Sequence, residues 1–252
     1  MHILALHGFT GRGCDFDFLS DLIGGVWRCP DLPGHGPDPQ LDCSPEATIR
    51  FIDNELSQYI RPNAESIKVL IGYSMGARAA MQHVLTNRKV WDALILISPQ
   101  PGIEDTSKRL ARQASDAILE AQILRCGVRD FIEFWQQTDL IKSQDRISTH
   151  QRSVMQSGRE EHTTEGLAKS LREFGQGRCP DLWPKLKDFT IPTLIITGQE
   201  DTLYTKISNN IRCKNFNEHG TQIFQYSIIK NAGHAPHLEY PEITAKKIRE
   251  FL

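Results

Sequence analysis

Residues 67–85 read IKVLIGYSMGARAAMQHVL, and the order of features in this stretch decides the fold. An apolar run over Ile67–Ile71, typical of a buried strand, leads into Gly72-Tyr73-Ser74-Met75-Gly76, and a helix is predicted over Ala77–Leu85. Strand, G-x-S-x-G and helix in this order are typical of a nucleophile elbow, a sharp turn that exposes a serine hydroxyl. Glycine on both sides lets the chain bend tightly. The stretch therefore predicts Ser74 as a nucleophile.

Short apolar runs bounded by Gly, Pro or Asp recur on both sides of this stretch. They are Ile3–Leu6, Ala93–Ile97, Thr193–Thr197 and Ile223–Ile229. Continuous rather than alternating hydrophobicity is typical of parallel strands, because both faces of such a sheet are covered. Helical patterns lie between the runs, as in Ala47–Ile60, which follows a Ser-Pro-Glu start signal. The alternation predicts an α/β protein with a mostly parallel sheet and helices on both faces.

The middle of the chain, residues 99–187, differs from both ends. It is polar and has no comparable strand run, and its helical patterns cover Thr106–Leu124, Val128–Gln137 and Glu165–Phe174. We interpret this segment as a helical cap inserted into a core made of residues 1–98 and 188–252, in a single domain overall.

Composition and charge exclude several classes of protein. The 252 residues carry a net charge of −2, and Lys and Arg are dispersed, so we expect no nucleic acid or membrane partner. No apolar stretch approaches the roughly 20 residues that span a bilayer, and the first apolar run is too short for a signal peptide. The six scattered cysteines are typical of reduced thiols in a cytoplasmic protein without a metal site. We expect no cofactor, and either a monomer or a small homo-oligomer.

A serine nucleophile needs a base and a carboxylate that orients the base. Asp201 ends a loop that follows one predicted strand, and His234 ends the loop that follows the next. Catalytic groups in open α/β sheets gather at this carboxyl edge. We therefore predict Asp201 and His234 as the partners of Ser74.

Alternatives remain for both partners. Asp201 could be the N-cap of the next helix, with Glu200 as the acid in its place. His237 competes with His234, but the chain is turning where it lies, so we give it a structural role.

An oxyanion that forms beside Ser74 needs two backbone N–H donors. One should be the amide of Met75, which follows the nucleophile, and the other that of Phe9, in the loop after the first strand. A second glycine-rich loop, Asp31–Gly36, contains His35, to which we assign a structural role.

Arginines are the feature that a simple hydrolase would not need. Arg78 lies one helical turn after Ser74, and Trp135 lies in the predicted cap. The remaining candidates, all in the predicted cap, are Arg109, Arg112, Arg152 and Arg159. Because a guanidinium binds a carboxylate with two parallel hydrogen bonds, several of them around one pocket would suit a small-molecule polycarboxylate substrate. The alternative is that each is a solvated surface arginine.

Taken together, several motifs resemble one family over essentially the whole chain. They are HGFTG, DLPGHG, GYSMGAR, FWQQ, GLAKSLREFGQGRCPDLW, GQED and NAGH. The chain is similar to the 2-succinyl-6-hydroxy-2,4-cyclohexadiene-1-carboxylate synthases of menaquinone (vitamin K2) biosynthesis, which are members of the α/β-hydrolase superfamily. The resemblance implies the α/β-hydrolase fold and a lyase reaction that eliminates pyruvate from 2-succinyl-5-enolpyruvyl-6-hydroxy-3-cyclohexene-1-carboxylate.

The resemblance also implies roles for individual residues. In this family's reaction Ser74, activated by His234 and Asp201, would abstract a proton, and the amides of Phe9 and Met75 would hold the resulting enolate. The positions that match the family's substrate-binding residues are Tyr73, Arg78, Arg112, Trp135 and Arg159, with Arg152 as the alternative to the last.

Two other functions fit a serine triad on this fold. One is hydrolysis of small esters or of carbon–carbon bonds, and the other is a non-catalytic receptor. A pocket rich in arginine favours the lyase over an esterase, whose pocket would be apolar.

Overall fold

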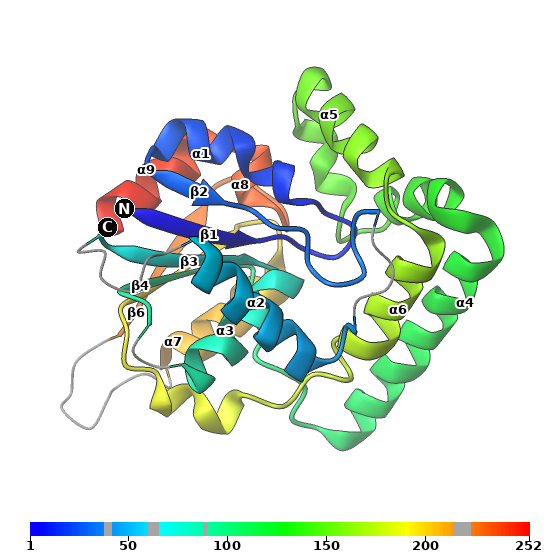
Figure 1. Ribbon diagram of the computed structural model, residues 1–252, viewed down its shortest axis with the longest axis horizontal. Coiled ribbons are helices and arrows are strands. Elements are labelled where there is room, and N and C mark those ends of the chain that lie inside the picture. The colour runs from blue at the N-terminus through cyan, green and yellow to red at the C-terminus, as the bar shows by residue number, and fades with distance from the viewer. Residues whose placement is uncertain (38–41, 60–65, 88–89, 214–222) are drawn as a thin grey trace.

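A sheet of six parallel strands runs through the centre of the computed structural model, which describes residues 1–37, 42–59, 66–87, 90–213 and 223–252 (Figure 1). The strand order is β2-β1-β3-β4-β5-β6, and every neighbouring pair is parallel. The strands are β1 (His2–Leu6), β2 (Val26–Arg28), β3 (Lys68–Tyr73), β4 (Ala93–Ile97), β5 (Thr193–Gly198) and β6 (Phe224–Ile229). All five predicted strands are confirmed within two residues at each end, and β2 is the additional one.

Helices cover both faces of the sheet, as predicted. The helices α2 (Pro45–Tyr59), α3 (Met75–Thr86) and α7 (Thr202–Cys213) cover one face, and α1 (Asp17–Ile23), α8 (Pro236–Glu239) and α9 (Pro241–Phe251) cover the other (Figure 1). Successive strand residues pack in opposite clusters: Leu4 lies with α2 and α3, while Ile3 lies with α1 and α9. This two-sided burial explains the continuous hydrophobicity of the strands. The last residue of the predicted helix Ala47–Ile60 lies outside the described residues.

Helices alone make up the regular structure between β4 and β5, a stretch that the structure describes completely. It contains α4 (Thr106–Gln136), η2 (Lys142–Arg146), α5 (Thr149–Glu160), α6 (Thr164–Phe174) and η3 (Trp183–Asp188). The two helices predicted over 106–137 are the two arms of α4, which is interrupted at Gly127, where φ is +78°. Leu167 and Leu171 of α6 pack against Phe131 of α4 in an apolar cluster of their own. The limits of the cap, residues 99 and 187, stay a prediction.

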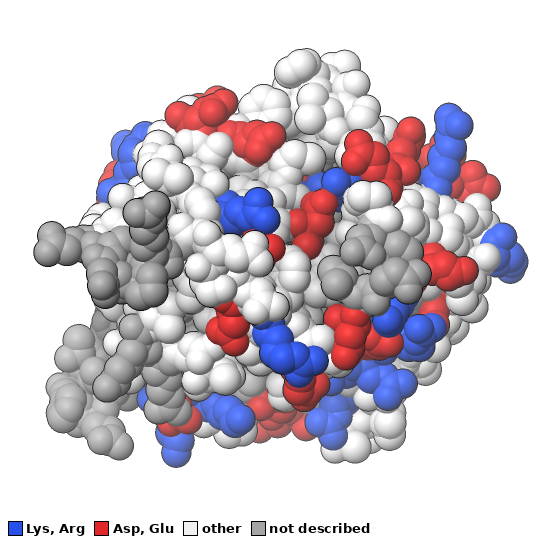
Figure 2. All heavy atoms as spheres, viewed as in Figure 1, with Lys and Arg blue, Asp and Glu red and all other residues white. Residues whose placement is uncertain are grey.

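The carboxyl ends of all six strands meet at one edge of the sheet, because the strands are parallel. The helices α4, α5 and α6 lie beyond that edge, on the right in Figure 1. Charges of both signs are interspersed on the face drawn in Figure 2. None of the described helices is both long and apolar enough to cross a bilayer. The predicted catalytic loops therefore emerge between the sheet and the inserted helices.

Candidate active site

Ser74 occupies the sharp turn between β3 and α3 that the sequence predicts. Its backbone has φ +51° and ψ −104°, a conformation that costs a non-glycine residue about 1–3 kcal/mol. A Cβ at Gly76 would lie 2.0 Å from the Leu6 carbonyl oxygen, and one at Gly72 would lie 2.5 Å from the Gly76 carbonyl oxygen. Backbone carbonyl groups lie so close to Gly72 and Gly76 that neither position has room for a side chain.

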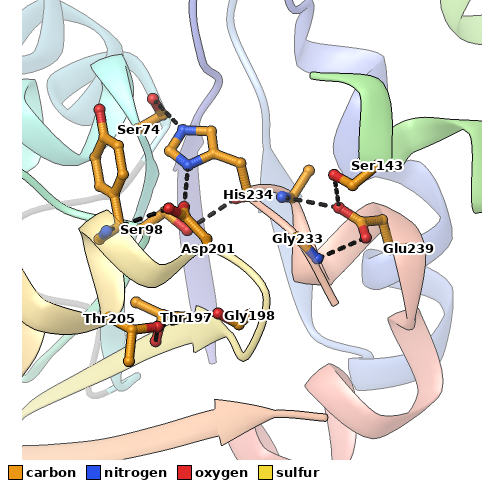
Figure 3. Close-up of polar contacts among 12 residues, drawn as sticks. Ser74, Ser98, Ser143, Thr197, Gly198, Asp201, Thr205, Gly233, His234 and Glu239 are labelled. Carbon is orange, nitrogen blue, oxygen red and sulfur yellow. Dashed lines mark hydrogen bonds and ion pairs between the residues drawn. The ribbon is translucent and has the colours of Figure 1, made fainter. Parts of the chain in front are cut away.

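His234 and Asp201 lie in line with Ser74 (Figure 3). The Ser74 hydroxyl lies 2.9 Å from Nε2 of His234, and Nδ1 of His234 lies 2.5 Å from Oδ2 of Asp201. Both side chains are almost fully buried, with exposed fractions of 2% and 7%. The arrangement can move a proton away from Ser74 and leave the resulting imidazolium next to a carboxylate.

The alternatives for the acid and the base are also placed. Asp201 makes the contacts of both of its predicted roles, because its second oxygen accepts a hydrogen bond from the Tyr204 amide at 3.2 Å, in the first turn of α7. Glu200 pairs with Arg146 instead of His234. His237 is buried, and its ring lies against those of Phe16 and Tyr73. Burial lowers the pKa of His237 to about 3, so this imidazole is neutral.

Phe9 and Met75, whose amides are the predicted oxyanion donors, line the same cavity as Ser74. Met75 is the first residue of α3, so its N–H has no partner within the helix. The chain turns at Gly8–Gly11, where the Gly11 amide donates to the Gly8 carbonyl at 3.0 Å. The two predicted donors therefore both lie just after the carboxyl ends of adjacent strands, β1 and β3.

The cavity over Ser74 encloses about 60 Å³ and brings together three of the predicted substrate residues, Arg78, Arg112 and Trp135. Arg78 is buried, and its guanidinium donates to the Phe174 carbonyl at 3.3 Å and lies over the Phe174 ring. No carboxylate of the described residues forms an ion pair with it. Arg112 pairs with Asp116 at 2.7 Å and bonds Gln176.

Two predicted substrate residues lie outside the lining of this cavity. Tyr73 is buried behind the triad, with its ring 5.5 Å from that of His234. Arg159 is buried and donates to Gln144 at 2.8 Å, and it lines a groove between η2 and α5 together with Arg152. The structure therefore places neither Arg152 nor Arg159 in the cavity over Ser74. Arg109 is also absent from the lining.

Three polar lining residues were missed by the sequence analysis: Ser170, Gln176 and Tyr204. The Tyr204 ring meets that of His234 edge-on at 4.4 Å. Its position three residues after Asp201, in the first turn of a helix, is the signal that could have found it. Ser170 and Gln176 lie within the GLAKSLREFGQGR stretch, but that motif does not say which of its side chains face the cavity.

A cluster of three buried histidines underlies the Phe9 loop. The His35 ring lies 4.8 Å from that of His7 and 5.2 Å from that of His162. Burial lowers the pKa of His7 and of His35 to about 3 and that of His162 to about 4. All three are therefore neutral in the folded protein at pH 7, which agrees with the structural role predicted for His35.

This cluster predicts that the protein loses stability in acid. The unfolded chain takes up protons on these histidines below about pH 6.5. The folded chain does so only near pH 3–4. Each histidine should therefore lower the free energy of unfolding by about 1.4 kcal/mol per pH unit across this window as pH falls. Asp15 has the opposite effect, because burial raises its pKa to about 6. The folded chain therefore takes up one proton on Asp15 at a higher pH than the unfolded chain does, which stabilises the fold as pH falls. Urea unfolding at pH 7, 6 and 5 measures the slope.

The matched variants are His35→Asn, which removes a buried histidine, and His150→Asn, which removes an exposed one. The first should flatten the pH dependence and the second should not. Equal slopes in the two variants would contradict the assignment.

Known proteins resemble this chain in sequence and in fold. The model of the alpha/beta hydrolase family matches residues 3–247. A protein of Bacillus subtilis (strain 168), provisionally named as a 2-succinyl-6-hydroxy-2,4-cyclohexadiene-1-carboxylate synthase, is 31% identical over 99% of this chain and 89% of its own length. A protein of Serratia proteamaculans (strain 568) with that name is 23% identical over 99% and 92%.

Solved structures also resemble this chain. MenH from S. aureus superposes with a TM-score of 0.89 and 26% identity, covering 100% of this chain and 93% of that one. An esterase from Thermogutta terrifontis shares the fold, with a TM-score of 0.73 and 21% identity over 99% and 88%.

Proposed function

The chain belongs to the α/β-hydrolase family and, within it, to the 2-succinyl-6-hydroxy-2,4-cyclohexadiene-1-carboxylate synthases, and from this premise we propose that it is the pyruvate-eliminating lyase of menaquinone biosynthesis. Its substrate would be 2-succinyl-5-enolpyruvyl-6-hydroxy-3-cyclohexene-1-carboxylate. The reaction needs a base for a carbon-bound proton, a site for an enolate and binding groups for three carboxylates.

We assign the proton transfer to the triad. Ser74, deprotonated by His234, takes the ring proton next to the succinyl carbonyl, and Asp201 stabilises the imidazolium. The electrons of the broken C–H bond pass into the carbonyl, and the amides of Phe9 and Met75 hold the enolate oxygen. When the enolate collapses, the ring double bond shifts by one position, a second forms, and the C–O bond to the enolpyruvyl group breaks. The leaving group takes up a proton to become pyruvate.

The observation that carries the proposal is the buried guanidinium of Arg78 in the cavity of Ser74. A buried charge without an opposite charge is destabilising, and an anionic ligand would compensate for it. Arg112 lines the same cavity, so two carboxylates of one substrate could be bound there. An esterase for simple substrates would have no use for either charge.

The cavity is smaller than the ~300–1,000 Å³ typical of ligand pockets, so side chains around it must move for the substrate to bind. Leu140 is a candidate for this movement, since it lines both the cavity and an open groove of about 570 Å³ that reaches His234.

The test is the release of pyruvate from the enolpyruvyl substrate, followed through lactate dehydrogenase and the consumption of NADH. We expect rapid release of one pyruvate per substrate and only slow turnover of p-nitrophenyl acetate. Fast ester hydrolysis without pyruvate would assign the chain to the hydrolases. Tight binding of the substrate without turnover would indicate a receptor.

A further inference from the structure

Glu239 is a buried carboxylate that the proposed reaction does not use. Its side chain is 0% exposed. It accepts hydrogen bonds from the amides of Gly233 at 2.7 Å and Ala235 at 3.2 Å (Figure 3). These are the residues on either side of His234, so the carboxylate fixes the backbone that carries the base.

The same carboxylate is bound from the opposite side by η2, which lies among the inserted helices. The Ser143 hydroxyl donates to Glu239 at 2.9 Å, and Arg146 approaches it at 3.6 Å (Figure 3 draws the serine). A Cβ at Gly233 would lie 2.1 Å from the Ser143 oxygen, so the segment lies directly against the histidine loop.

Arg146 extends this contact to the second catalytic loop. It donates to the Asn231 carbonyl at 2.8 Å, in the histidine loop, and to Glu200 at 2.5 Å, next to Asp201. One side chain of η2 therefore reaches the loops of both the base and the acid. From the core, the Ser98 hydroxyl donates to the His234 carbonyl at 2.8 Å.

We propose that Ser143, Arg146 and Glu239 are positioning residues, through which η2 holds His234 at hydrogen-bond distance from Ser74. His234 is on a loop, and the hydrogen bond to Ser74 depends on where that loop lies. Glu239 fixes the loop, Ser143 donates a hydrogen bond to its buried carboxylate, and Arg146 supplies the opposite charge. A movement of η2 away from the core would therefore loosen the contact between His234 and Ser74. The inference goes beyond the proposed reaction and rests only on the Ser74–His234 pair.

The test measures the pair without the natural substrate. A small fluorophosphonate reacts at Ser74: the serine oxygen bonds to phosphorus, the P–F bond breaks, and His234 takes the proton. We expect Ser143→Ala to lower the second-order rate constant of this labelling by about 10-fold, the effect of losing one hydrogen bond to a charged group. Ser115→Ala is the matched control, because Ser115 is exposed on α4 and bonds only the Ala111 carbonyl.

Glu239→Gln is the second variant. The amide keeps the size of the side chain but replaces one acceptor oxygen by a donor, so labelling should slow by at least as much. Thermal unfolding of each variant separates positioning from folding. If Ser143→Ala labels as fast as the unaltered chain, the inference is wrong, whatever its melting temperature. If Glu239→Gln does not fold, Ser143→Ala alone decides.

If the proposed function is wrong and the positioning inference is right, the two assays give different answers. The labelling differences would remain while no variant, nor the unaltered chain, releases pyruvate.

Discussion

Ser74→Ala and His234→Ala are each expected to lower kcat for pyruvate release by about 1000-fold, within the range that positioned acid–base groups contribute. Alanine at position 74 removes the oxygen that takes the substrate proton in the proposed reaction. Alanine at position 234 removes the imidazole that lies 2.9 Å from that oxygen and 2.5 Å from Asp201. KM should change little, because the arginines that would bind the carboxylates remain. Steady-state kinetics with the coupled pyruvate assay measures both constants.

The double variant sharpens this prediction. Residues that act as one unit give non-additive losses, so Ser74→Ala/His234→Ala should be no slower than the worse single variant. Full activity of Ser74→Ala combined with a large loss in His234→Ala would contradict the role of the serine, and His234 would then take the proton directly.

The contact between Ser74, His234 and Asp201 could be predicted from the sequence because each of these residues follows a strand of a parallel sheet. Ser74, Asp201 and His234 end β3, β5 and β6 or follow them closely, and parallel strands bring those ends to one edge. The strands themselves were recognisable because both faces of the sheet are covered. The patterns of the strands and of the loops that follow them were therefore sufficient to predict which three side chains meet.

The inserted helices were less predictable, because their positions depend on contacts between distant residues. The helix α5 was not predicted: few of its residues are apolar, and only Met155 joins a core cluster. The choice between Arg152 and Arg159 also could not be made from spacing, since both line a groove away from Ser74. The break in α4 lies between the two predicted helices, Thr106–Leu124 and Val128–Gln137, where Gly127 adopts a positive φ.

The hardest side chains to predict were those whose contacts are with residues far away in the sequence. The sequence analysis singled out Asp201 and not Tyr204, three residues later. It also did not single out Glu239, which ends the short helix α8. Nothing in the residues around Ser143 indicates that it meets Glu239, 96 positions later. Such contacts become visible only once the insertion lies against the core.

Arg78→Ala is expected to lower kcat/KM for pyruvate release by about 100-fold, mostly through KM, because removing one partner of a buried charge pair costs about 2–5 kcal/mol of binding. Arg78 lines the cavity of Ser74, its guanidinium donates to the Phe174 carbonyl, and no carboxylate of the described residues forms an ion pair with it. Its removal should therefore leave the free energy of unfolding nearly unchanged or raise it, since an uncompensated charge leaves the interior. Urea unfolding measures this second effect.

Two further variants make the prediction specific to a carboxylate. Arg78→Lys keeps the charge but loses the planar pair of donors, so its KM should lie between those of the alanine variant and the unaltered chain. Arg125→Ala, which removes an exposed arginine of α4, should leave KM unchanged. A large loss of stability in Arg78→Ala with an unchanged KM would mean that this guanidinium supports the fold through Phe174 and does not bind substrate. The opposite pattern, a raised KM in a chain at least as stable, is what a binding residue held ready in the interior should give.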